Sequence, residues 1–321
     1  MKIVMMGTGP FAVPLFRWLV ESPHQVCLLV TRPVAGSGRR KTPANPVREF
    51  ASGLQNPPPV YDPANINDPA GVARLREAAA DLLMVCDYGS ILSADVLATT
   101  RLGGINLHGS LLPAWRGAAP INWAIFHGAT ETGVSVIHMT PRLDGGPVLV
   151  RKQLAIGARE TAAQLEPRMA ELGVPAVEEA IQLLETWDGQ AALGTRQDPG
   201  LVTQAPRLTR DQGRLDWTRS APELQRQIRA FQPWPGSFTH WHPAAGRSLR
   251  IIVWSATVSQ RRATTDPGTV EQVDEPGIVV ASGQGCLVLQ ELQPAGKRVM
   301  SAAEFLRGRA VQPGDRLGDA D

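Results

Sequence analysis

The chain has 321 residues, of which 43% are hydrophobic and 19% charged, and its formal net charge is +2. This composition excludes a disordered or fibrous protein and leaves room for two domains with ample cores. The small net charge excludes overall basicity as the basis of nucleic-acid binding, so any such function must depend on local charge.

The three cysteines, Cys27, Cys86 and Cys286, are odd in number and far apart in the sequence. Two of them lie in apolar runs, which favours buried free thiols in a reducing compartment over a disulfide framework. No Cys or His pair has the spacing of a zinc site, so we expect no metal. No apolar run approaches membrane-spanning length and no signal peptide precedes the first strand, so we expect a cytoplasmic protein.

The first predicted strand is Lys2–Met6, and GTGPFA follows it over residues 7–12. A G-x-G-x-x-A pattern between a strand and a helix outlines a dinucleotide fingerprint, but it also fits the first turn of a doubly wound α/β sheet. The next strand, 25–31, ends in Arg32, where an NAD site would have an acidic residue. We therefore predict a tight turn without a dinucleotide, and an NADP-binding reductase is the alternative.

Residues 32–48 contain five basic residues, no acidic residue, and several glycines and prolines. Such a segment cannot pack as core and belongs on the surface. Two interpretations remain open on composition alone: a solvated linker, or an arm that contacts phosphate groups.

The predicted buried strand Gly104–His108 ends in a long loop. Residues two apart in a strand share a face, so Asn106 and His108 point the same way near its carboxyl end, where ligands bind in open α/β sheets. An amide donor beside an imidazole suits acyl chemistry, because one stabilises an oxyanion and the other moves a proton. The alternative is that Asn106 caps a turn and His108 is a satisfied core histidine.

The remaining pattern indicates a long amphipathic helix over 161–187, then a linker, and then short β-rich runs between 248 and 292 that are typical of a small barrel. We therefore expect a doubly wound, mostly parallel α/β domain over 1–188, a linker over 189–206 and an OB-like barrel domain over 207–321. OB-like barrels commonly bind nucleic acid.

The run NLHGSLLP over residues 106–113, followed by WRGAAPI over 115–121, resembles the signature of the folate-dependent formyltransferases. The second half of this run is most similar to the branch of that family that acts on methionyl-tRNA. The turn Leu143-Asp144-Gly145-Gly146 is similar to the family's Leu-Asp-x-Gly turn, although the family's usual Thr is Gly145 here. Without the resemblance, Asp144 is equally well interpreted as a turn residue.

The resemblance implies roles for particular residues. The catalytic residues would be Asn106, His108 and Asp144. The folate would contact two segments that leave carboxyl ends of strands, namely Cys86, Asp87, Tyr88, Gly89, Ser110, Leu111, Leu112 and Pro113. The tRNA would contact Arg39, Arg40, Lys41 and Arg116. Asp87 stands where the family has a small residue, and its role is left open.

The resemblance implies transfer of a formyl group from 10-formyltetrahydrofolate, as co-substrate, to methionyl-initiator tRNA in translation initiation, by an enzyme that we expect to be a monomer. Its nearest rival is a formyltransferase with another acceptor: glycinamide ribotide, a nucleotide amino sugar, or water. Rivals of other classes are the reductase and a folate- or RNA-binding protein without catalysis.

Overall fold

A computed structural model describes residues 1–33, 45–189, 191–244, 246–274 and 277–319. The chain divides into two compact units. The first comprises Met1–Pro120, Glu131–Ala155 and Glu166–Pro206, and the second comprises Ile121–Thr130, Ile156–Leu165 and Arg207–Asp321. Within the described ranges, no helix is both long and apolar enough to cross a membrane.

The first unit is built on one large sheet, and the part of the chain that the structure describes gives it seven strands in the order β3-β2-β1-β4-β5-β7-β8. Neighbouring strands from β3 to β5 run parallel, whereas β7 pairs antiparallel with both β5 and β8. The predicted doubly wound, mostly parallel sheet is therefore confirmed. Its strands are β1 (Lys2–Gly7), β2 (Gln25–Val30), β3 (Val60–Tyr61), β4 (Leu82–Cys86), β5 (Gly104–His108), β7 (Glu131–His138) and β8 (Val148–Ala155).

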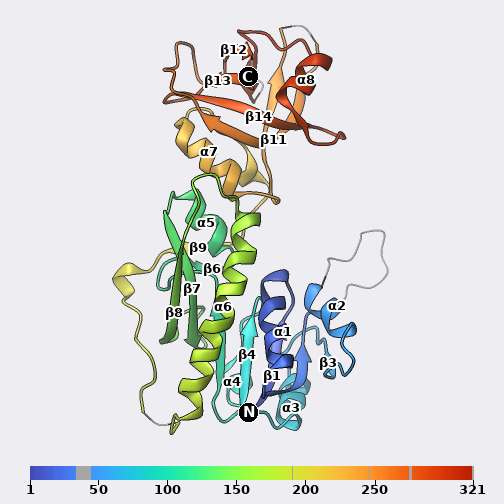
Figure 1. Cartoon of the computed structure of the whole chain (residues 1–321), viewed down its shortest axis with the longest axis vertical. Helices are drawn as coiled ribbons and strands as arrows, with labels where there is room; N and C mark the ends of the chain where they lie inside the picture. Colours follow the sequence, from blue (N-terminus) through green and yellow to red (C-terminus); the bar gives the residue numbers. More distant parts are fainter. Residues whose placement is uncertain (34–44, 190, 245, 275–276, 320–321) are drawn as a thin grey trace. The chain divides into compact units, whose positions relative to one another are not determined.

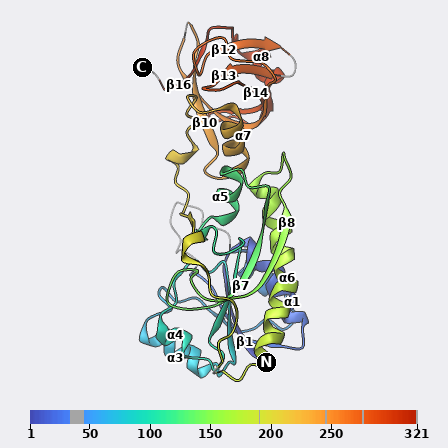
Figure 2. The same ribbon diagram turned by 90° about the vertical axis from the view of Figure 1, so that its left-hand side faces the viewer.

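Helices cover both faces of this sheet. Figure 2 shows α3 (Pro69–Glu77) and α4 (Ala94–Leu97) on the face opposite to α1 (Val13–Glu21) and α6 (Ala162–Glu185). Residues of α3 and α4 pack on alternate residues of β1 and β4, such as Val4 and Val85. Helix α6 presses on the other face so closely that a Cβ on Gly173 would lie 2.4 Å from Leu107. The inner strands β1 and β4 are apolar on both sides because both faces are covered.

Shorter elements complete the first unit. They are η1 (Pro10–Ala12), α2 (Pro46–Ser52), β6 (Arg116–Gly117), η2 (Pro199–Leu201) and β9 (Gln204–Ala205). Strands β6 and β9 pair with each other in parallel (Figure 1). The segment that we expected to be a linker thus contributes a short strand to the first unit.

The second unit is an antiparallel, nearly closed barrel, as expected. Its described strands follow the order β12-β13-β14-β11-β10-β16, with β15 beside β14. A bridge between Thr269 and Arg316 joins the chain next to β12 to β16, which brings the two edges together. The elements are η3 (Asp211–Gly213), α7 (Ala221–Ala230), β10 (Ser237–His242), β11 (Leu249–Val258), β12 (Val270–Asp274), β13 (Gly277–Ala281), β14 (Cys286–Pro294), β15 (Met300–Ser301), α8 (Ala302–Gly308) and β16 (Arg316–Gly318).

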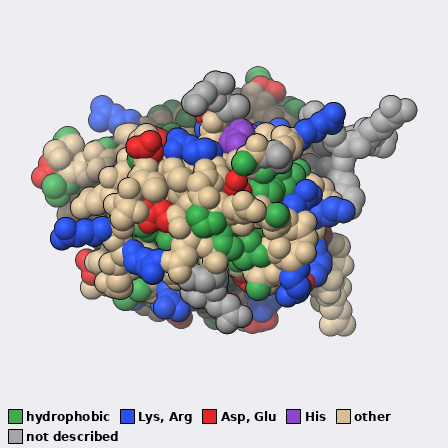
Figure 3. Space-filling view, turned by 90° about the horizontal axis from the view of Figure 1, so that it is seen from above, with side chains coloured by type: hydrophobic (Ala, Val, Ile, Leu, Met, Phe, Trp, Pro, Cys, Tyr) green, Lys and Arg blue, Asp and Glu red, His purple; other side chains and the backbone are tan. Residues whose placement is uncertain are grey.

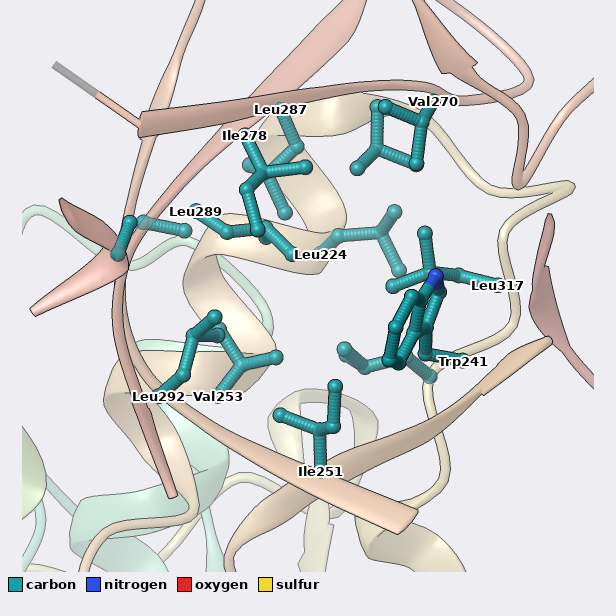
Figure 4. Close-up of a cluster of buried hydrophobic side chains, with 14 of the residues drawn as sticks. Leu224, Trp241, Ile251, Val253, Val270, Ile278, Leu287, Leu289, Leu292 and Leu317 are labelled. Atoms are coloured by element: carbon teal, nitrogen blue, oxygen red, sulfur yellow. The ribbon is translucent and has the colours of Figure 1, made fainter. Parts of the chain in front are cut away.

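The barrel interior is filled by apolar side chains from its strands and from α7 (Figure 4). Alternation along β14 decides which residues enter it: Leu287 and Leu289 point inward, whereas Val288 joins a separate cluster with Val279 and Cys286.

Two earlier segments of the chain, Ile121–Thr130 and Ile156–Leu165, belong to the second unit because they contact α7 and the turn after it. Helix α5 (Pro120–Phe126) stacks Phe126 on Phe231, with ring centroids 5.2 Å apart, and Asn122 donates a hydrogen bond to the carbonyl of Ala230. Arg229 donates to the carbonyl of Glu160 in the second segment.

Candidate active site

The candidate site lies at the carboxyl end of β5. Asn106 is half-buried and His108 is 6% exposed, so only a small part of the imidazole is open to solvent. Strand pairing places Asn106 beside Val85 of β4, and the end of β4 therefore lies next to His108. This is the edge at which ligands bind in open α/β sheets.

The imidazole of His108 lies between two hydrogen-bond acceptors. Its Nε2 is 3.0 Å from the carbonyl oxygen of Trp115, and its Nδ1 is 3.7 Å from Oδ1 of Asp144. A neutral imidazole has one donor, whereas the protonated ring donates from both nitrogens. The protonated ring is thus the form that can donate toward both neighbours, and this arrangement suits a residue that carries a proton during a reaction.

Asp144 is itself held by the backbone of the opposing loop. Its Oδ2 accepts a hydrogen bond of 2.8 Å from the backbone N–H of Gly117, which leaves Oδ1 directed at His108. The side chain is 10% exposed. The structure therefore brings His108 and Asp144 together from β5 and from the turn between β7 and β8.

Backbone strain gathers at this edge of the sheet. Among the described residues other than glycine, positive φ angles occur at Asp87 (49°), Trp115 (62°) and Asp144 (47°), and elsewhere at Ala79. Such angles cost free energy and persist where the surroundings enforce them, which is common at functional sites.

The loop after β5 is fixed by its own hydrogen bonds. The hydroxyl of Ser110 is buried and donates to the carbonyl of Ala114. Ser135 donates to the carbonyl of Ser110 and accepts from the N–H of Leu112, and Arg151 donates to the carbonyl of Leu112. Ser110 and Leu112 therefore shape the loop from within it.

The end of β4 faces the first turn of the chain. The backbone carbonyl of Asp87 accepts from the N–H of Thr8, and its carboxylate fills the space beside Gly9, where a Cβ would lie 1.8 Å from Oδ2. The glycine-rich turn thus fits against a carboxylate, and this negative charge would oppose a dinucleotide pyrophosphate.

The residue Asp87 is exposed to solvent, but many protein atoms surround its carboxyl group. Burial among these atoms raises the pKa of Asp87 to about 6, with a further upward contribution from Glu166 and a downward one from Arg32. Neighbouring Tyr88 is buried, which raises its pKa to about 12. Burial also raises the pKa of Cys86 well above its usual range, so this thiol stays protonated and is no nucleophile.

Arg116 is half-buried and both its Nε and Nη2 donate to the side-chain oxygen of Gln197. Arg39, Arg40 and Lys41 lie outside the described residues. Among the residues that the structure describes, no group of three or more His, Cys, Asp and Glu could hold a metal ion.

The sequence interpretation missed the residues after α6 whose side chains contact the loops of the site. Gln197 and Thr203 both contact the site's loops, and the sequence around them, TRQDPGLVTQAP over residues 195–206, has no helical or strand periodicity. The backbone groups of Trp115 and Gly117 were also missed as partners of His108 and Asp144, although they lie in the WRGAAPI run.

Comparison with known proteins defines the class. Residues 1–181 match the family described as Formyl transferase, and residues 207–310 match Formyl transferase, C-terminal domain. The chain belongs to this family.

Several relatives that are similar over the whole chain carry the name methionyl-tRNA formyltransferase. The relative from Rhodopirellula baltica is 44% identical, covering 99% of this chain and 96% of its own length. The relative from Myxococcus xanthus is also 44% identical, covering 98% of this chain and 97% of its own.

Solved structures support the fold. An N-formyltransferase from Helicobacter canadensis, in complex with folinic acid and dTDP-3-aminofucose, superposes with a TM-score of 0.64 at 14% identity, covering 90% of this chain and 99% of that chain. HypX from Aquifex aeolicus, in complex with tetrahydrofolic acid, gives 0.61 at 16% identity. The match covers 95% of this chain and 47% of HypX, so this chain spans about half of that protein.

Proposed function

We propose that this enzyme transfers the formyl group of 10-formyltetrahydrofolate to the amino group of methionyl-initiator tRNA, and so acts in translation initiation in the cytoplasm. The observation that carries the chemistry is the position of the His108 ring between the Trp115 carbonyl and the Asp144 carboxylate. Asn106 lies two residues before His108 on the same strand. The acceptor is supported by the full-length relatives named for methionyl-tRNA.

The reaction forms a bond between the amino nitrogen and the formyl carbon and breaks the bond from that carbon to N10 of the folate. A free α-amino group titrates near pH 8, so a substantial part of the nucleophile is already neutral. The demanding steps are stabilising the tetrahedral oxyanion and protonating N10, which is otherwise a poor leaving group. The proton that leaves the amine is equivalent to the one that N10 gains.

Each catalytic side chain has one task in this scheme. The amide of Asn106 donates a hydrogen bond to the oxyanion, a contribution typically worth about 3 kcal/mol. His108 carries the proton from the attacking nitrogen to N10. Asp144 orients the imidazole and stabilises its charged form, as a carboxylate does in a hydrolase triad.

We place the folate against two loops at this edge, residues 86–89 and 110–113. Burial of Ser110 and Leu112 supports a role for the second loop through its backbone and shape rather than through these side chains. Asp87 would then face the bound folate, and its carboxylate has the raised pKa described above.

For the tRNA we propose contacts from Arg39, Arg40 and Lys41, from Arg116, and from the domain at 207–321. Residues 201–321 contain 15 Lys and Arg against 12 Asp and Glu. In Figure 3, basic side chains on the visible face are interspersed with acidic and apolar ones. This weak local excess makes the basic segment 32–48 the stronger candidate for phosphate contacts.

The acceptor is tested by incubating the enzyme with 10-formyltetrahydrofolate and, separately, methionyl-initiator tRNA, glycinamide ribotide and a dTDP-amino sugar. Formyl transfer to the tRNA alone is expected, and preferred use of either small acceptor would refute the assignment. Replacing Arg39, Arg40 and Lys41 together by alanine should weaken tRNA use and reduce its salt dependence by about one unit of slope per lost contact.

A further inference from the structure

Residues 195–206, called the return segment here, pass directly over the loop that follows β5. Strand β9 pairs with β6, the N–H of Trp115 donates to the hydroxyl of Thr203, and the N–H of Arg116 donates to the carbonyl of Thr203 (Figure 1). At the other end of the segment, Thr195 exchanges two backbone hydrogen bonds with Val148 at the start of β8. The return segment therefore contacts both loops that flank His108.

Gln197 joins these two loops through one side chain. Its Nε2 donates to the backbone carbonyls of Asp144 and Gly146, both at 2.7 Å. Its Oε1 accepts from Nε and Nη2 of Arg116, at 3.1 and 2.7 Å. The two amide hydrogens and both lone pairs of the oxygen are thus all engaged.

Gln197 holds the two loops whose atoms lie beside the imidazole of His108. One is the turn that carries Asp144, whose φ of 47° needs external support. The other is the loop that carries the Trp115 carbonyl and the Gly117 N–H, which contact His108 and Asp144. If either loop relaxes by a fraction of an ångström, the acceptors around the ring lose their alignment, and catalysis is sensitive to such displacements.

We propose that Gln197 is a positioning residue for formyl transfer, which holds the Asp144 turn and the Arg116 loop at their distances from His108. The inference rests on the proposed function, since it assumes that His108 and Asp144 act in the reaction. It predicts that the loss from removing Gln197 falls on kcat and is smaller once Asp144 has been removed.

The test compares Gln197→Ala, Gln197→Glu and Gln204→Ala by kcat and KM for both substrates. Gln204 is an exposed glutamine on the same segment and contributes its backbone to β9, so Gln204→Ala is the matched control. Gln197→Ala should lower kcat roughly tenfold or more, as expected for hydrogen bonds that include a charged partner. Gln197→Glu keeps an acceptor for Arg116 but loses both donors to the carbonyls, and should not restore kcat.

Coupling to Asp144 separates positioning from a general loss of structure. Adding Gln197→Ala to Asp144→Ala should lower kcat by a smaller factor than Gln197→Ala does in the parent, because groups that act as a unit are not additive. Amide exchange should also quicken in peptides that cover residues 113–119. An unchanged kcat, full additivity with Asp144→Ala, or unchanged exchange at 113–119 would each overturn the inference.

The exchange measurement requires no acceptor, and the proposed function is tested on the parent enzyme alone. If the unmodified enzyme fails to formylate methionyl-tRNA, the proposed function is refuted. If amide exchange is unchanged in Gln197→Ala, the positioning role of Gln197 is refuted.

Discussion

Replacing Gly117 by alanine should disable the site while leaving the sheet intact. Gly117 has a φ of 127°, and a Cβ there would lie 2.4 Å from the carbonyl oxygen of Ala205 on β9. Both the backbone angle and the overlap resist a side chain, so residues 116–118 must move. That movement withdraws the N–H that donates to Asp144 at 2.8 Å.

The magnitude follows from the bond that is lost. A hydrogen bond to a charged group contributes about 1.5–3 kcal/mol, which corresponds to a loss of roughly 10- to 150-fold in turnover if the whole effect falls on the transition state. The control is Gly189→Ala in the same unit, which also has a positive φ (80°) but nothing within 4 Å of a new Cβ. It should cost about 1 kcal/mol of stability and leave turnover unchanged.

Steady-state formylation at saturating substrates, with thermal unfolding measured in parallel, distinguishes the two variants. If Gly117→Ala keeps the parent's kcat, the backbone donor to Asp144 has no role in formyl transfer. If Gly189→Ala loses as much turnover as Gly117→Ala, the effect is strain in general and not the contact with Asp144.

Three further predictions concern stability. Since the pKa of Asp87 is raised to about 6 from an ordinary 3.8, the folded state loses stability as pH rises through this range, so Asp87→Asn should raise Tm most above pH 6, and the gain should vanish below about pH 4. Hydrogen bonds from the hydroxyl and N–H of Ser220 lower the pKa of Glu223 to about 2, so its contribution is present above pH 4.5 and is lost as pH falls toward 2. Glu223→Ala removes the acceptor and should cost about 1 kcal/mol at pH 7 by urea unfolding, and an unchanged midpoint would refute the capping role. Leu289→Ala in the barrel core should destabilise the second unit by about 2–5 kcal/mol by the same assay, and a loss below 1 kcal/mol would show that the cluster in Figure 4 is loosely packed.

The part of the site on β5 was predictable because it depends on local pattern. An apolar run that ends in Asn106 and His108 fixes the strand, its two-residue alternation and its carboxyl end. The turn at Asp144 carries two glycines and is also visible in the sequence. The short β-rich runs separated by turn signals likewise predicted the barrel strands, including Gly277–Ala281.

The hydrogen bonds by which Gln197 joins the two loops could not be predicted in this way. They join residues more than fifty positions apart, and β9 has two residues, too few to show any periodicity. The contact between Gly9 and Asp87 could not be predicted either. The sequence shows that a glycine suits the turn at residue 9, but only the folded chain shows that the Asp87 carboxylate occupies the space where a Cβ would lie. Likewise, only the contacts of α7 and the turn after it explain why 121–130 and 156–165 belong to the second unit.

The central claim is that Asn106, His108 and Asp144 form one centre for formyl transfer to methionyl-tRNA. Its most direct test is single-turnover formylation of methionyl-tRNA by the three single alanine variants and by the double variant His108→Ala with Asp144→Ala. Each single variant should remain folded and lose roughly a hundredfold or more, and the double variant should lose little more than its worse component. A variant that formylates at nearly the parent's rate would remove its residue from the mechanism, and fully additive losses would contradict the single centre.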